Sequence, residues 1–174
     1  MDYPIIFLDI DHVLTNTDVD DTSYLNYDPS RYSLSEYNLK NLDKILNASG
    51  AKIVITSNWR RFIPPRNSWL YNGKHYMNQL PKFRERYSDY IIDDLPHDRH
   101  INKSEALELW CEDHHENFSQ TKDRYLILED DIREGYQDNV NFRKHLVLTD
   151  YHYGLSENDV KKSFEILGIS GKDI

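Results

Sequence analysis

The stretch Ile5-Ile6-Phe7-Leu8-Asp9-Ile10-Asp11-His12-Val13-Leu14-Thr15 decides the fold expected for this chain. Its first four residues form an apolar run that is typical of a strand buried on both faces of a parallel sheet. Unpaired carboxylates are costly to bury, so Asp9 and Asp11 are expected where this strand leaves the core. Ligands of open α/β sheets bind beyond the carboxyl ends of the strands. Asp is also common in turns, so this stretch alone fits turn chemistry as well as catalysis.

Segments with strand and helix patterns alternate along the rest of the chain, which predicts a central parallel sheet covered by helices on both faces. Four further strands are expected, at residues 52–56, 90–92, 125–128 and 145–148. Three helices are expected, over residues 33–46, 102–110 and 155–167. Ser33 and Glu36 would form a capping box at the start of the first helix, and Gly50 would end it.

Composition narrows the range of functions. The formal net charge of −9 argues against a broad nucleic-acid-binding surface, although a local basic patch stays open. The single cysteine, Cys111, excludes an intrachain disulfide framework and a cysteine-based zinc cluster. No segment has the character of a membrane span, and the N-terminus is typical of a strand rather than a signal peptide. We therefore expect a single cytoplasmic domain over residues 1–174, without membrane contact.

Side chains suited to chemistry follow the predicted strands or begin a predicted helix. They are Asp9, Asp11, Thr56, Ser57, Lys103, Glu129, Asp130 and Asp131. Parallel strands share one direction, so the groups at their carboxyl ends should meet at one edge of the sheet. Each group alone fits an ordinary role as a helix cap, a solvated lysine or a helix start. Their joint order favours a site for metal-assisted phosphoryl transfer.

The order Asp-x-Asp-x-x-x-Thr, hydrophobic-Thr/Ser, Lys, hydrophobic-acid-acid resembles the haloacid dehalogenase (HAD) superfamily of phosphohydrolases. The segments IVITSNWR (53–60), LILEDD (126–131) and LVLTDYHYGL (146–155) are similar to a compact subgroup that includes the HAD domain of Swiss-army-knife RNA-repair proteins. The chain departs from the common pattern at His12, where Gly is usual, and at Glu129, where Asp is frequent. The resemblance implies a three-layer Rossmann-like α/β fold and Mg²⁺-dependent hydrolysis of phosphomonoesters.

The resemblance also implies roles for individual residues. Asp9 would attack phosphorus and form an aspartyl-phosphate, while Asp11 would act as general acid and base. Thr56, or Ser57 as the alternative hydroxyl, would bind the phosphoryl oxygens, and Lys103 would add positive charge beside them. The Mg²⁺ ligands would be Asp9, the backbone carbonyl of Asp11 and an acid from the pair Glu129 and Asp130, of which Asp130 is preferred.

The intervals between the motifs suggest an open site. Residues 12–32 are expected to form a loop or flap and residues 58–100 a small lid or extra helices, so no large cap domain is predicted. A nucleotide or a nucleic-acid phosphate end is the favoured substrate, with other phosphorylated small molecules also possible. Trp59 could stack on a base and Arg60 could grip phosphate, although Trp59 could equally pack a helix start and Arg60 pair with an acid. His12 could narrow the flap or touch substrate.

Two alternatives use similar residues. Asp93 and Asp94 also follow a short strand, but the family order places the lysine before the final acidic pair, so the later cluster is preferred. A receiver-like signalling domain, phosphorylated on Asp, also combines acids, Thr/Ser and Lys, but there the acidic pair follows the first strand and the acceptor Asp a later one. A non-catalytic binding module on a HAD scaffold is the other alternative. The oligomeric state does not follow from the sequence.

Overall fold

Five parallel strands form the centre of the computed structural model, which describes residues 3–15, 34–57, 74–96, 100–114 and 124–170. The strands are arranged in the order β3-β2-β1-β4-β5. Their bounds are Ile5–Leu8 for β1, Lys52–Ile55 for β2, Ile91–Asp94 for β3, Tyr125–Glu129 for β4 and Leu146–Leu148 for β5. The prediction of a central parallel sheet is therefore confirmed, with β1 in the middle.

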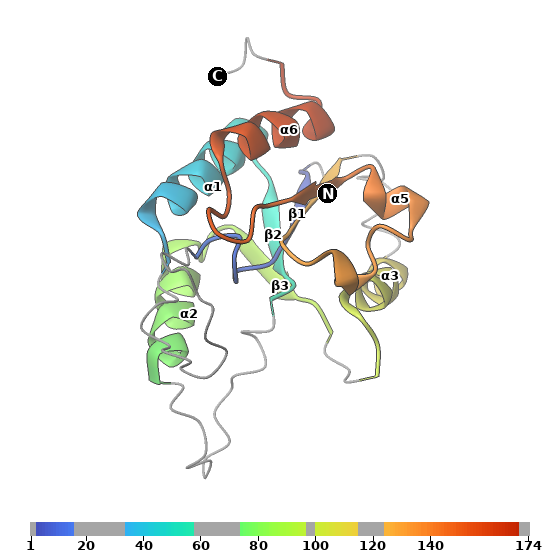
Figure 1. Cartoon of the computed structure of the whole chain (residues 1–174), viewed down its shortest axis with the longest axis horizontal. Helices are drawn as coiled ribbons and strands as arrows, with labels where there is room; N and C mark the ends of the chain where they lie inside the picture. The colour runs from blue at the N-terminus through green and yellow to red at the C-terminus, as the bar shows by residue number, and fades with distance from the viewer. Residues whose placement is uncertain (1–2, 16–33, 58–73, 97–99, 115–123, 171–174) are drawn as a thin grey trace.

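Helices cover both faces of this sheet and produce three layers (Figure 1). Alternate side chains of β1 point to opposite faces, as in any strand. Ile6 and Leu8 pack with α1 (Glu36–Ser49), α2 (Lys74–Arg86) and α6 (Glu157–Leu167). Ile5 and Phe7 pack on the other face with α3 (Lys103–Asp113) and α5 (Val140–Arg143). All four residues of β1 are buried, which explains the continuous apolar run.

The helix ends differ from the sequence expectation in more than one place. Helix α3 continues to Asp113 instead of ending at residue 110. Helix α1 begins after Ser35, whose hydroxyl accepts a hydrogen bond from the Asn38 amide, so the predicted start at Ser33 is wrong. The reason is that Leu34 forms an antiparallel bridge with Thr15, which keeps the backbone extended one residue beyond Ser33. Gly50 ends α1 in the left-handed conformation, as expected.

The predicted flap and lid fall largely outside the described residues, because 16–33 and 58–73 lie in the gaps. The described part of the interval 58–100 contains α2 and β3. Within the described ranges no separate cap domain is present, in agreement with the predicted fold class. The single domain over residues 1–174 stays a prediction.

Candidate active site

The central strands bring the predicted site residues to one edge of the sheet. Asp9 directly follows β1, and its amide donates to the Leu128 carbonyl of β4 at 3.0 Å. Thr56 directly follows β2, and its amide donates to the Leu8 carbonyl of β1 at 2.8 Å. Because Glu129 is the last residue of β4, the ends of three adjacent strands place their polar groups together.

Lys103 connects two of these strand ends. It is the first residue of α3, which begins with a capping box of Asn102 and Glu105. Its Nζ lies 2.8 Å from Asp9 Oδ2 and 2.8 Å from Glu129 Oε2, and all three side chains are at most 5% exposed. One buried ammonium therefore lies between two buried carboxylates, and the three residues come from separate parts of the sequence.

Glu134 is a further member of this cluster that the sequence reasoning missed. It ends the short 3₁₀ helix η3 (Ile132–Glu134), and its Oε1 lies 4.0 Å from Lys103 Nζ. Its Oε2 accepts a hydrogen bond from the Lys103 amide at 3.3 Å. A carboxylate at the N-terminus of α3 satisfies an amide that has no partner within the helix, and this helps to hold Lys103 in position. Its position within a helical turn, away from any strand end, gave no sequence signal.

The charges of this cluster shift the pKa values in opposite directions. Burial alone would raise the pKa of Asp9, but the Lys103 ammonium and hydrogen bonds to the carboxylate lower it overall. Burial and the negative charge of Asp9 raise the pKa of Glu129 well above its usual value. Burial tends to lower the pKa of Lys103, but Asp9 and Glu129 raise it. Asp9 and Lys103 therefore form a charged pair, whereas burial and the neighbouring Asp9 charge disfavour the ionised form of Glu129 and so raise its pKa.

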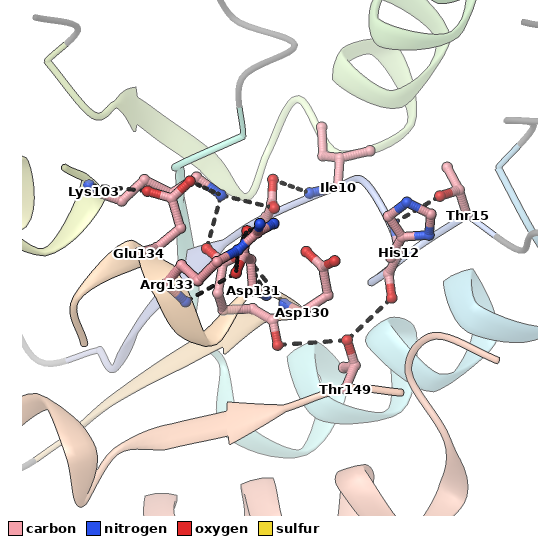
Figure 2. Close-up of polar contacts among 11 residues, drawn as sticks. Ile10, His12, Thr15, Lys103, Asp130, Asp131, Arg133, Glu134 and Thr149 are labelled. Atoms are coloured by element: carbon pink, nitrogen blue, oxygen red, sulfur yellow. Dashed lines mark hydrogen bonds and ion pairs between the residues drawn. The ribbon is translucent and has the colours of Figure 1, made fainter. Parts of the chain in front are cut away.

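Asp130 completes an acidic group that could hold a metal ion. One carboxylate oxygen from each of Asp9, Glu129 and Asp130 lies within 4.8 Å of the other two. Burial, followed by the charge of Asp9, raises the pKa of Asp130 to about 6. The cluster thus carries more carboxylates than Lys103 neutralises, and an all-oxygen donor set of this kind fits a hard dication such as Mg²⁺. Figure 2 shows Asp130 between the Lys103 side and the His12 side of the site.

The two acids that flank Asp130 in the sequence, Glu129 and Asp131, make different contacts. Glu129 Oε2 is paired with Lys103, and its Oε1 accepts from the amides of Asp130 and Asp131 at 3.2 and 3.3 Å. Asp131 is the N-cap of η3 and its carboxylate binds the amide and guanidinium of Arg133. The simple helix-start interpretation is therefore correct for Asp131, whereas Glu129 and Asp130 belong to the acidic cluster.

The hydroxyl residues after β2 lie inside the site. Thr56 and Ser57 are both buried, and a hydrogen bond between the Ser57 side chain and Asp9 contributes to the low pKa of that carboxyl. Asp11 is half-buried in the turn after β1, two residues beyond Asp9. Trp59 and Arg60 lie outside the described residues, so their predicted contacts with substrate stay predictions.

His12 joins the turn after β1 to the loop after β5. Its backbone has a φ of 50°, and its imidazole stacks on the Tyr151 ring with centroids 3.7 Å apart. Its Nδ1 lies 3.0 Å from the Tyr151 carbonyl oxygen. The Thr149 hydroxyl donates to the His12 carbonyl at 3.0 Å (Figure 2). Thr149 was missed, although it follows β5 just as Thr56 follows β2, and that position was the available signal.

Fold and site together define an α/β protein of the HAD type, with a buried acidic cluster and one lysine at the carboxyl edge of a parallel sheet. A family model described as the HAD domain in Swiss Army Knife RNA repair proteins matches residues 5–160, and the chain belongs to this family. Membership in this family supports the broad class of phosphatase-type hydrolases for this chain. No curated protein and no solved structure matches the chain. No helix in the described ranges is both long and apolar enough to cross a membrane.

Proposed function

We propose that this protein hydrolyses phosphomonoesters with Mg²⁺ and an aspartyl-phosphate intermediate on Asp9. The observation that carries the proposal is the Asp9 carboxylate, buried at the sheet edge, 2.8 Å from Lys103 Nζ and grouped with Glu129 and Asp130. A low pKa keeps Asp9 ionised near neutral pH, which a carboxylate nucleophile requires. The paired lysine offsets part of the repulsion between this carboxylate and an incoming phosphate.

The reaction would take place in two displacements. A bond forms between an Asp9 oxygen and phosphorus while the bond to the leaving oxygen breaks, and Asp11 gives that oxygen a proton. Asp11 then removes a proton from a water molecule, which attacks phosphorus and releases inorganic phosphate from Asp9. The half-buried position of Asp11, two residues beyond Asp9, suits a group that exchanges protons with water.

Phosphate binding and metal binding use the remaining residues. Ser57 or Thr56 would donate to the phosphoryl oxygens, and the contact of the Ser57 side chain with Asp9 supports Ser57 as a member of that site. Mg²⁺ would be held by Asp9, the Asp11 carbonyl and Asp130. Asp130 is preferred to Glu129 because it is less buried, and bound Mg²⁺ usually keeps several water ligands. When bound, the ion would neutralise charge on the transferring phosphoryl group.

The proposed substrate is a phosphorylated end of a nucleic acid or a nucleotide. Two points support this class: the family description refers to RNA repair, and the described ranges hold no cap that would exclude a large substrate. The acidic chain would bind such a substrate through its end rather than along its length. The single cysteine supports a cytoplasmic setting.

The decisive test is Asp9→Asn. We expect Mg²⁺-dependent release of phosphate from p-nitrophenyl phosphate to fall by roughly 10³-fold or more, because the nucleophile is lost. Asp93→Asn, a change of the same kind at the end of β3, is the matched control and should keep the parent rate. Trapping of labelled phosphate on the parent chain, and not on Asp9→Asn, would identify the intermediate. Retained turnover in Asp9→Asn would refute the assignment of the nucleophile.

A further inference from the structure

The loop after β5 begins beside the acidic cluster and carries three aromatic side chains in sequence. This segment, residues 149–155, is called the aromatic turn here, and it contains Tyr151, His152 and Tyr153. Its first residue, Thr149, donates its amide to the Glu129 carbonyl at 2.9 Å, so the turn begins beside the residue that precedes Asp130. The turn therefore starts at the same sheet edge as the acidic cluster.

Hydrogen bonds fix the shape of the aromatic turn. The Gly154 amide donates to the Asp150 carbonyl at 2.8 Å, and Gly154 has the positive φ that favours glycine. The Asp150 carboxylate accepts from the amides of His152 and Tyr153 at 2.8 and 3.2 Å. A loop with this much internal bonding loses little further conformational freedom when a ligand binds to it.

A second set of contacts fixes the aromatic turn to the turn that carries Asp11. The Leu155 amide donates to the Val13 carbonyl at 2.8 Å, and the Thr149 hydroxyl donates to the His12 carbonyl at 3.0 Å. The His12 ring covers one side of Tyr151. The position of the Tyr151 ring relative to Asp9 and Asp11 is therefore set by contacts on both turns.

The backbone of His12 adopts a conformation that is uncommon for a residue with a side chain. A residue with a Cβ is disfavoured at a φ of 50°, where glycine would be unstrained. Such strain persists where surrounding contacts hold it, and it tends to occur at functional sites. The contacts that hold it are the stacked Tyr151 ring and the Tyr151 carbonyl, so His12 positions Tyr151.

Two tyrosines of the aromatic turn remain open to solvent despite this order. Tyr151 is 50% exposed and Tyr153 is 73% exposed. Exposed aromatic rings on a well-ordered turn beside a catalytic edge are suited to stacking on planar groups of a ligand. Among phosphorylated compounds, nucleotides and nucleic-acid ends carry such a planar group next to the phosphate, and sugar phosphates do not.

We infer that the aromatic turn is the base-binding subsite of this protein, with Tyr151 and Tyr153 stacking on the nucleobase of the phosphorylated end and His12 as the residue that positions Tyr151. The inference rests on the proposed function, because it assumes that the terminal phosphate lies at Asp9. Stacking accepts any base, so the subsite would select nucleic-acid ends without reading their sequence. It would also supply affinity that does not depend on a basic surface, which suits a chain with a net charge of −9.

The test measures binding separately from turnover. In the Asp9→Asn chain with Mg²⁺, fluorescence anisotropy would compare two short labelled single strands that end in phosphate, one with a base on its terminal nucleotide and one abasic there. Both 5′- and 3′-phosphorylated pairs are used. We expect the base to increase affinity by roughly 5- to 100-fold for one of the two ends, as one or two stacked aromatic residues would. Tyr151→Ala and Tyr153→Ala should each reduce this preference several-fold.

Two further variants distinguish the loss of stacking from a general loss of folded structure. Tyr153→Phe keeps the ring and should keep the preference, and Tyr3→Ala, which removes a tyrosine preceding the amino end of β1, should also leave it unchanged. An equal affinity for base-bearing and abasic strands in the starting chain would overturn the inference, as would an unchanged preference in both Tyr151→Ala and Tyr153→Ala. If the Asp9→Asn chain prefers the base but the parent chain hydrolyses no phosphomonoester, the subsite is retained and the proposed function is overturned. If the parent chain hydrolyses phosphomonoesters but the Asp9→Asn chain shows no base preference, the proposed function is retained and the subsite is overturned.

Discussion

Two strand ends of the same sheet each carry a pair of acids, and only their surroundings distinguish them. At the end of β3, Asp93 accepts from the Trp110 indole nitrogen at 2.6 Å, and Asp94 pairs with Arg84 at 2.5 Å. Both aspartates keep about 40% of their side chains exposed. At the end of β4, Glu129 is almost fully buried and shares the Lys103 ammonium with Asp9 of β1, and the second acid of the pair, Asp130, is half-buried.

A functional site is therefore distinguished by the balance of charge around its acids, and not by the number and spacing of those acids. Each acid of β3 has its own partner and contact with water, so the pair needs no ligand. The acidic cluster has surplus negative charge in a buried place, and raised pKa values of Glu129 and Asp130 are the consequence. Strong perturbation by burial and by specific neighbours is characteristic of functional sites. This supports the choice of the later acidic pair over Asp93 and Asp94.

The largest expected effect follows from removing the cation of each region. Lys103→Met leaves two buried carboxylates without their ammonium, and we expect a loss of about 3–5 kcal/mol in the free energy of unfolding at pH 7 together with loss of phosphatase activity. Arg84→Met breaks a half-exposed pair and should lose less than about 1 kcal/mol. Urea unfolding of both variants measures the difference. Similar losses in the two variants would show that the acidic cluster is no more dependent on its cation than the β3 pair.

A smaller effect is expected when one acid of each region is neutralised and metal binding is measured. Asp130→Asn should weaken Mg²⁺ binding by about 10-fold or more in isothermal titration calorimetry, because it removes a proposed ligand. Asp94→Asn, an equal change at the end of β3, should leave the affinity as it is in the parent. Since protons compete for a carboxyl whose pKa is about 6, the affinity of the parent should also fall below that pH. Equal Mg²⁺ affinity in the parent and in Asp130→Asn would remove Asp130 from the proposed ligands.

The strands and the meeting of the motifs could be predicted because each depends on local pattern and strand direction. The apolar run before Asp9 and the acids after Leu128 are visible without any structure, and parallel strands bring such ends together. The sequence predicts the start of α1 two residues early because its apolar stripe fits either start, and the Thr15–Leu34 bridge that decides between them is a tertiary contact. Glu134 and the stacking of His12 on Tyr151 likewise depend on loop conformation, which carries no periodic signal.

The smallest expected effect is the pH dependence of stability in the metal-free protein. The pKa of Asp130 is raised in the folded state from 3.8 to about 6, so between these values the folded state binds more protons than the unfolded state. Stability therefore decreases as the pH rises through this window, and Asp130→Asn should remove that decrease. Because Asp130 is only half-buried, we expect Asp130→Asn to gain about 1 kcal/mol relative to the parent between pH 4 and pH 7.

Asp94→Asn should not show this gain in the free energy of unfolding. It loses the ion pair with Arg84 and should be no more stable than the parent at pH 7. Saturating Mg²⁺ should abolish the advantage of Asp130→Asn, because an ion bound by the parent stabilises the ionised carboxylates of its folded state. Urea unfolding at pH 4 and pH 7, with and without Mg²⁺, measures all of these differences. If Asp130→Asn and Asp94→Asn responded alike to pH and to Mg²⁺, the acids of the two strand ends would be equivalent, and the charge surplus assigned to the cluster would be wrong.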